Sequence, residues 1–222
     1  AYQTRQPLTL IARALSRRDA IPSYALFWLT AYASFGAGIG ALLIAVYDYW
    51  LLVPLVALAG LLLGVHLFLS TRRADMTVGG ELIGIAGLTL GAPATYYVGA
   101  GSPGIQMLGL WLLSFLYFGG SVFYVKLKVR VHSRQQPPAS SLQRMLVGKT
   151  TVIYHVGAIA LAGVLVATGL VPLLAPLAYI PVSCKAVRGT LDWRRPVNIK
   201  RLGVMEIVHS LVFAVLLVIA YS

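Results

Sequence analysis

Long apolar segments separated by short polar connections restrict this chain more than any other feature of its sequence. A helix rises about 1.5 Å per residue, so about 20 predominantly apolar residues cross a hydrocarbon layer of about 30 Å. The pattern predicts an all-α fold, a polytopic transmembrane helix bundle of seven spans that forms a single transmembrane domain over residues 1–222. The segments that reach or approach the required length are 23–47, 50–69, 80–98, 105–125, 151–170, 172–187 and 203–221.

The composition excludes an ordinary soluble domain. Hydrophobic residues make up 59% of the chain and charged residues only 11%, whereas soluble domains contain about 25% charged residues. A water-soluble domain of this size lacks the polar surface that would cover so many apolar side chains. The excess apolar surface is therefore expected to face lipid.

The segment 172–187 is the weakest of the seven because it contains three prolines. Pro172, Pro176 and Pro181 each lack a backbone N–H and interrupt a regular helix. We expect this segment to be either a kinked span that leans on its neighbours or a broken span that lines a cavity.

The positions of the basic residues predict how the bundle is oriented. Cytoplasmic connections of membrane proteins are enriched in Lys and Arg, and all eighteen such residues fall on one side of the seven predicted spans. The N-terminus is therefore expected to be cytoplasmic and the C-terminus to lie outside. The basic regions are the cytoplasmic tail 1–22 with Arg5, Arg13, Arg17 and Arg18; the turn with Arg72 and Arg73; the cytoplasmic connection 126–150 with Lys126, Lys128, Arg130, Arg134, Arg144 and Lys149; and the stretch with Lys185, Arg188, Arg194, Arg195, Lys200 and Arg201.

The net charge of +12 indicates an anionic partner. Basic connections with few aromatic residues fit anionic lipid headgroups better than nucleic acid, and each Lys or Arg near such a surface contributes about 1 kcal/mol. We expect the partners to be a bilayer with anionic headgroups and other membrane protein subunits, and no nucleic acid.

Four glycines of the third segment lie on one helical face. Gly80, Gly84, Gly87 and Gly91 are spaced i, i+4, i+7 and i+11, and such a flat stripe lets another helix approach closely. We interpret the stripe as a helix-packing seam, within the bundle or with a neighbouring subunit. A groove for an isoprenoid or pigment tail is the alternative. Pro93 is expected to bend the outer end of this span.

Five ionisable residues lie inside predicted spans, where such groups are functional candidates by default. His66, Glu81, His155, Glu206 and His209 all fall within about two turns of a cytoplasmic span end. This depth argues against a proton relay or an ion-coupled transporter, which needs a polar site near the middle of the membrane.

These residues support three interpretations. Glu81 and Glu206 could pair with basic residues of the adjoining connections and hold the helix ends together. Alternatively, Glu81, Glu206 and His209 could form a polar pocket for the head of a quinone or a lipid. His66, His155 and His209 are candidate cofactor ligands, since neutral imidazole binds haem iron and chlorophyll-type magnesium. The basic residues named for the first interpretation are Arg72, Arg73, Lys126 and Arg201.

A metal centre is not expected. Glu206 and His209 have the Glu-x-x-His spacing of half a di-iron site, but the sequence lacks the second pair and the further glutamates that such a site needs. There is also no P-loop, GxSxG, HExxH or aspartate-rich motif. No catalytic residues are therefore predicted.

These observations favour a non-catalytic integral membrane subunit that packs against other membrane proteins, in a quinone- or pigment-using electron-transport or photosynthetic complex. The sequence does not identify a cofactor; the candidates are a quinone, a pigment or a bound lipid. The alternative is a membrane enzyme or carrier that handles an isoprenoid or quinone in the cytoplasmic-side pocket.

Several stretches are similar to a known family. Residues 5–10 (RQPLTL), 81–98 (ELIGIAGLTLGAPATYYV), 118–130 (FGGSVFYVKLKVR) and 197–210 (VNIKRLGVMEIVHS) resemble the YwiC-like family of bacterial multi-pass membrane proteins. The resemblance implies the bacterial cytoplasmic membrane and assigns no activity. Members usually begin with further spans that carry a His-Gly-x-Trp motif. This sequence starts at Ala1 without that motif, so we expect either a preceding N-terminal piece or a shortened member.

Overall fold

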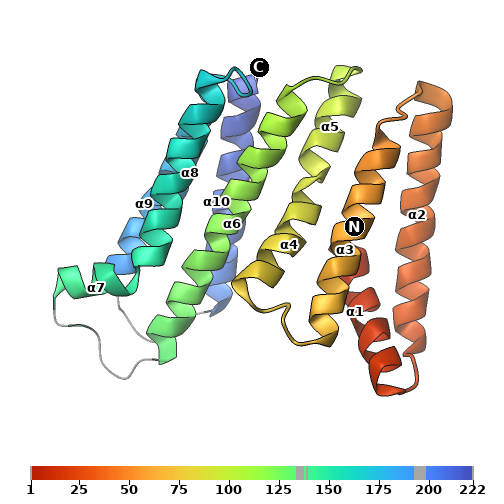
Figure 1. Ribbon diagram of the computed structural model, residues 1–222, viewed down its shortest axis with the longest axis horizontal. Helices are drawn as coiled ribbons and strands as arrows, with labels where there is room; N and C mark the ends of the chain where they lie inside the picture. The colour runs from red at the N-terminus through yellow and green to blue at the C-terminus, as the bar shows by residue number, and fades with distance from the viewer. Residues whose placement is uncertain (1, 134–137, 139, 193–198, 222) are drawn as a thin grey trace. The chain divides into compact units, whose positions relative to one another are not determined.

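The computed structural model describes residues 2–133, 138, 140–192 and 199–221, and these residues form helices and connections without a β-strand (Figure 1). Three of the basic residues named above, Arg134, Arg194 and Arg195, lie outside the described residues. The chain divides into two compact units, residues 1–107 and 108–222, which are described separately. The single domain over residues 1–222 stays a prediction.

Unit 1 contains five helices. They are α1 (Tyr2–Arg17), α2 (Ser23–Tyr47), α3 (Leu52–Thr71), α4 (Val78–Thr89) and α5 (Gly91–Ala100). Helix α2 has the bounds expected from the apolar pattern, and it ends where Asp48 adopts a left-handed conformation. Helix α1 occupies most of the tail 1–22, for which no helix was predicted, and it packs against α2 and α3.

The third predicted span is interrupted. Helix α4 ends at Thr89, α5 begins at Gly91, and Leu90 lies between them. Pro93 explains the position of the break, because a proline has no N–H to donate to the carbonyl four residues earlier, that of Thr89. The hydroxyl of Thr89 donates to the carbonyls of Ile85 and Ala86 in the last turn of α4. The bend expected near Pro93 is thus an interruption three residues before it.

Helices α3 and α4 pack along the glycine stripe. A Cβ added at Gly84 would lie 3.1 Å from Nδ1 of His66, and one at Gly87 would lie 3.3 Å from Cβ of Leu62. A Cβ at Gly91 would meet no atom within 4 Å. The stripe therefore brings α4 close to α3 at Gly84 and Gly87, and this contact stops before Gly91.

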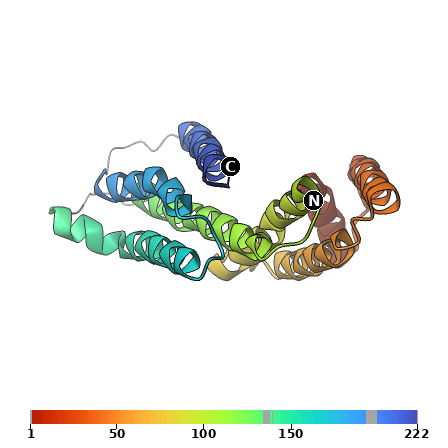
Figure 2. The same cartoon turned by 90° about the horizontal axis from the view of Figure 1, so that it is seen from above.

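Unit 2 contains the remaining helices (Figure 1). They are α6 (Gln106–Ser133), α7 (Ser141–Val147), α8 (Lys149–Ala167), the 3₁₀ helix η1 (Ala175–Tyr179), α9 (Ile180–Leu191) and α10 (Ile199–Tyr221). Helices α8 and α9 run side by side (Figure 2). The core centres on Tyr117 of α6, whose ring stacks on Phe213 with centroids 3.8 Å apart, and on Tyr179.

The proline-rich segment 172–187 is not a continuous helix. It consists of a connection, the short η1 and the first part of α9, which matches the broken rather than the kinked alternative. The segment nevertheless runs along α6. Val171 lies beside Gly109, the hydroxyl of Tyr179 donates to the carbonyl of Leu113, and Lys128 contacts the carbonyl of Gly189. Residues 109–128 of a helix extend over about 28 Å.

Six helical segments are long and apolar enough to cross a membrane, among the residues that the structure describes. They are Ser23–Tyr47, Leu52–Thr71, Val78–Ala100, Gln106–Val131, Lys149–Ala167 and Lys200–Tyr221. The prediction of an all-helical, multi-pass fold is confirmed. The segment 172–187 is not one of the six, so the count of seven spans and the orientation of the termini stay predictions.

The glycine contacts predict a position-dependent effect of side-chain size. Gly87→Leu should destabilise the chain by about 1–3 kcal/mol, because the new side chain overlaps Leu62 in a closely packed seam. Gly91→Leu, in the same stripe but in open space, should leave the unfolding temperature in detergent nearly unchanged. Equal effects of the two variants on this temperature would contradict the seam.

Candidate functional site

Two sites stand out, one in each unit. The first, which we call the apolar groove, lies in unit 1 between α2, α3 and α4 and has a volume of 730 Å³. The second, the basic pocket, lies in unit 2 between α6, α9 and α10 and has a volume of 380 Å³.

Small side chains form much of the apolar groove. Helix α2 contributes mostly glycine and alanine, at a spacing that places them on one face, and α3 contributes aliphatic residues with Ala59 and Gly60. A Cβ added at Gly36, Gly40 or Gly60 would meet no atom within 4 Å. The lining residues are Tyr32, Ala33, Gly36, Ala37, Gly40, Ala41, Ile44, Leu52, Val53, Val56, Ala59, Gly60, Leu62, Leu63, His66, Gly84, Gly87 and Leu88.

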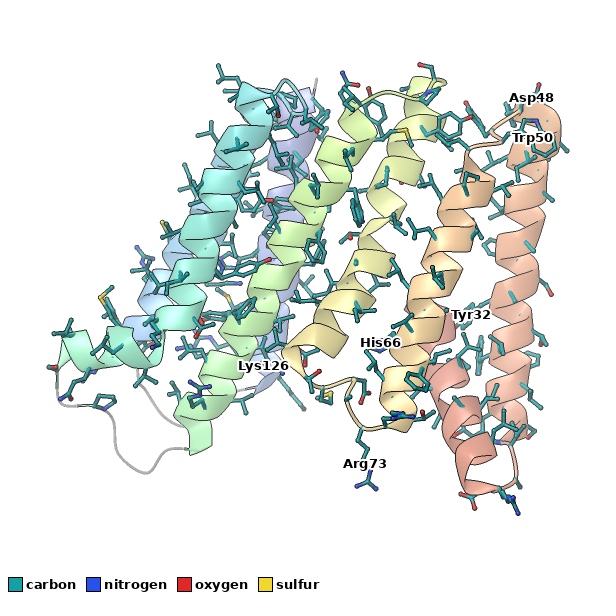
Figure 3. All side chains as sticks on the ribbon, in the orientation of Figure 1. Tyr32, Asp48, Trp50, His66, Arg73 and Lys126 are labelled. Carbon is teal, nitrogen blue, oxygen red and sulfur yellow. The ribbon has the colours of Figure 1, made fainter. Side chains whose placement is uncertain are left out.

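Tyr32 and His66 are the polar side chains of this groove (Figure 3). The imidazole of His66 is buried, and its Nδ1 lies 3.1 Å from the carbonyl oxygen of Gly80. Because a carbonyl only accepts, Nδ1 must carry the proton in this contact, which leaves Nε2 as the acceptor of the ring. Glu81 follows Gly80 in the first turn of α4 and is half-buried; a carboxylate is favourable at a helix N-terminus.

A buried ion pair organises the polar side chains of unit 2. Nζ of Lys185 in α9 lies 2.8 Å from Oε1 of Glu206 in α10, and the two side chains are only 7% and 18% exposed. Ser121 of α6 donates its hydroxyl to the other carboxylate oxygen at 2.8 Å. The pair thus joins three helices through one carboxylate. Lys185 is not among the partners that the sequence suggested for Glu206.

The ring of Tyr124 lies beside two ammonium groups. Nζ of Lys185 is 4.7 Å and Nζ of Lys128 is 5.9 Å from its centroid. Lys128 also donates to the carbonyl oxygens of Gly189 and Asp192, at 2.8 and 2.9 Å. Lys128 therefore binds carbonyls at the C-terminal end of α9, where a positive charge is favourable.

The two other predicted histidines lie on different helices of unit 2. His155 of α8 is buried, and its Nδ1 lies 2.7 Å from the carbonyl oxygen of Thr151. Its Nε2 is buried without a hydrogen-bond partner among the described residues and lies against Gly120, whose missing side chain leaves room for the ring. His209 of α10 lines the basic pocket, and its Nδ1 lies 2.7 Å from the carbonyl oxygen of Met205.

The structure therefore distributes the predicted site residues over both units. Glu206 and His209 lie on neighbouring turns of α10, at the ion pair and the basic pocket respectively. His66 and Glu81 belong to unit 1, at and beside the apolar groove. The described residues contain no group of three or more His, Cys, Asp or Glu side chains placed to hold a metal ion.

Sequence reasoning missed Lys185, Tyr124 and Ser121 as partners at this site. Lys185 was counted only as a connection residue, although it lies inside a segment predicted to span the membrane. A lysine within an apolar segment indicates a buried anionic partner, because an unpaired charge is costly there. That signal could have directed attention to Glu206.

The ion pair predicts a non-additive effect of mutation. Glu206→Gln should cost about 3 kcal/mol, because it leaves the Lys185 ammonium buried without a carboxylate. The double variant Lys185→Met with Glu206→Gln should recover most of this loss, since it removes both charges. Thermal unfolding in detergent measures both effects. A double variant less stable than Glu206→Gln alone would contradict this account.

Comparison with known proteins gives one result. Residues 1–96 match the family described as YwiC-like protein, and this range contains every lining residue of the apolar groove. The resembling stretches 5–10 and most of 81–98 fall within the match, whereas 118–130 and 197–210 lie beyond it. No curated protein and no solved structure matches the chain. The match supports the expected resemblance: the chain is a multi-pass helical protein with a YwiC-like region over residues 1–96.

Proposed function

We propose that this protein is a non-catalytic integral membrane subunit whose apolar groove receives a transmembrane helix of another membrane protein. The observation that carries the proposal is the glycine and alanine face of α2, which lines an open groove opposite Gly60 and the aliphatic residues of α3. We place its partner in a quinone- or pigment-using complex of the bacterial cytoplasmic membrane.

Helix α2 contributes little to the packing of its own chain. Ala25 is its only buried residue, and large side chains such as Phe35 are well exposed. Exposure to lipid explains the large apolar side chains of such a helix. It does not explain a face of glycine and alanine, which offers lipid little contact area.

Small residues do favour contact between transmembrane helices. Lipid tails are as apolar as leucine, so helices associate in a membrane through close van der Waals contact, which glycine and alanine permit. Gly36 and Gly40 have the i, i+4 spacing of such contacts, and Gly60 lies across the groove from them. A partner helix in the groove would contact both faces.

The proposal predicts that a large side chain in the groove prevents association. Gly40→Leu should reduce the partner polypeptides that co-purify with the tagged protein by tenfold or more. The fold should tolerate this change, because a Cβ at Gly40 meets no atom within 4 Å. Gel electrophoresis of complexes extracted from native membranes in mild detergent measures the effect.

Gly38→Leu is the matched control. Gly38 lies on the same helix and also has open space around it, but it does not line the groove. This variant should keep its partners. Loss of association in both variants, or in neither, would contradict docking in the groove, and so would migration of the native protein as a lone monomer.

A second candidate function is the binding of an isoprenoid or quinone in the same groove. Its volume lies within the range of about 300–1,000 Å³ that is typical of ligand sites, which combine apolar walls with a few polar groups. Tyr32 and the Nε2 acceptor of His66 supply such groups. The same purified samples discriminate the candidates: a small molecule in the organic extract, lost in Gly40→Leu without any loss of polypeptides, favours this one.

We further propose that the chain crosses the membrane seven times, with the N-terminus cytoplasmic. The course of η1 and α9 along residues 109–128 of α6 supports a crossing by this broken segment. An alkaline phosphatase fused after Ser222 should then be active, since it folds only outside the cytoplasm, and a fusion after Lys149 should be inactive. The reverse pattern, or two inactive fusions, would contradict this topology.

A further inference from the structure

The basic pocket of unit 2 is lined mainly by charged and polar side chains. Most of its residues come from α9, and the others come from α6, from α10 and from Asp192, which follows α9. Figure 3 labels Lys126, which lies two residues before the pocket on α6. The lining residues are Tyr124, Lys128, Pro181, Cys184, Lys185, Arg188, Gly189, Asp192 and His209.

Positive charge exceeds negative charge at this pocket. Lys128, Lys185 and Arg188 line it, whereas the carboxylates beside them are Asp192 and Glu206, the latter through its pair with Lys185. Lys128 and Lys185 are both buried. The two lysines have carboxylate and carbonyl acceptors, so the excess positive charge is that of the exposed Arg188, and an anion in the pocket would balance it.

The ammonium groups have protons left for a ligand. Lys185 donates to one carboxylate oxygen, and Lys128 donates to two backbone carbonyls. Because an ammonium group has three donors, these bonds leave two protons on Lys185 and one on Lys128 within the part of the chain that the structure describes. Both groups line the pocket and lie within 6 Å of the Tyr124 centroid.

Arg188 supplies the geometry that a phosphate group prefers. It is exposed at the pocket and lies three residues after Lys185, on the same face of α9. Its planar guanidinium can donate two parallel hydrogen bonds to one phosphate. Arg188 and Lys185 together offer hydrogen-bond donors to one ligand. The ion pair with Glu206 already fixes the position of the Lys185 ammonium group.

Apolar surface continues from the pocket. Pro181 and Cys184 form part of its wall, and α10 exposes Val204, Met205 and Val208 in the turns around His209. Acyl chains could pack on these residues while the headgroup occupies the pocket. Basic pockets between transmembrane helices are known sites of anionic lipid headgroups.

We propose that the basic pocket binds a phosphate-bearing anion through Arg188 and Lys185, namely the headgroup of an anionic phospholipid. Lys128 secures the end of α9 and adds one donor, and Tyr124 holds both lysines in place. This proposal does not rest on the function proposed for the apolar groove.

Titration of the purified full chain in detergent with phosphatidylglycerol tests the site. Native mass spectrometry measures how much lipid remains bound. Arg188→Gln should weaken binding about tenfold, because it removes a charge-assisted donor pair. Lys149→Gln, which removes an exposed charge of α8 outside the pocket, should bind as the unchanged chain does. Arg188→Lys should fall between them, since it keeps the charge but loses the planar donors.

Two further arms identify the ligand. Zwitterionic phosphatidylcholine should bind much more weakly than phosphatidylglycerol. Inorganic phosphate, added as a competitor, should displace little phosphatidylglycerol, because free phosphate lacks the acyl chains that pack on α10. Complete displacement by inorganic phosphate at a comparable concentration would overturn the assignment to a lipid headgroup. Equal binding of phosphatidylglycerol by Arg188→Gln, Lys149→Gln and the unchanged chain, at equal unfolding temperatures, would overturn the proposal.

Discussion

The need to satisfy backbone hydrogen bonds away from water governs this structure. A helix satisfies them within itself, which is why the apolar segments are helical. Polar side chains also bond to carbonyls near helix ends. The hydroxyl of Thr89 donates to carbonyls in the last turn of α4, and Lys128 donates to carbonyls at the end of α9. The irregular backbone of unit 2 is therefore held against α6 by specific polar contacts.

The sequence predicts most of the architecture because apolar length alone defines a span. The bounds of α2 match the apolar segment 23–47, and Pro93 indicates the interruption between α4 and α5. Helix α1 was not predicted, because its residues are polar and basic enough to resemble a tail. Its position depends on packing against α2 and α3, which a single sequence does not display.

The candidate sites were harder to predict than the helices. Glu206 and His209 were recognised because ionisable residues in a membrane are rare. Their surroundings depend on α9, whose course follows from three prolines and from contacts with α6. The pairing of Lys185 with Glu206 is a contact between residues on two helices, and neither spacing nor composition specifies it. A groove was considered only as the alternative interpretation of the glycine stripe, of which Gly84 and Gly87 line the apolar groove. The contribution of α2 was not predicted, since it requires α2 and α3 to face each other.

The two sites suit different partners. The apolar groove presents small residues and open space, which suit a helix, and it lies entirely within the YwiC-like region. The basic pocket presents fixed donors, which suit an anionic headgroup.

Site-specific photocrosslinking in native membranes tests the central claim, that a partner helix docks in the apolar groove, most directly. A photoreactive residue at position 40 should form an adduct with another polypeptide, whereas one at position 38 should not. Lipid adducts alone at position 40, or equal adducts at both positions, would contradict a partner helix in the groove.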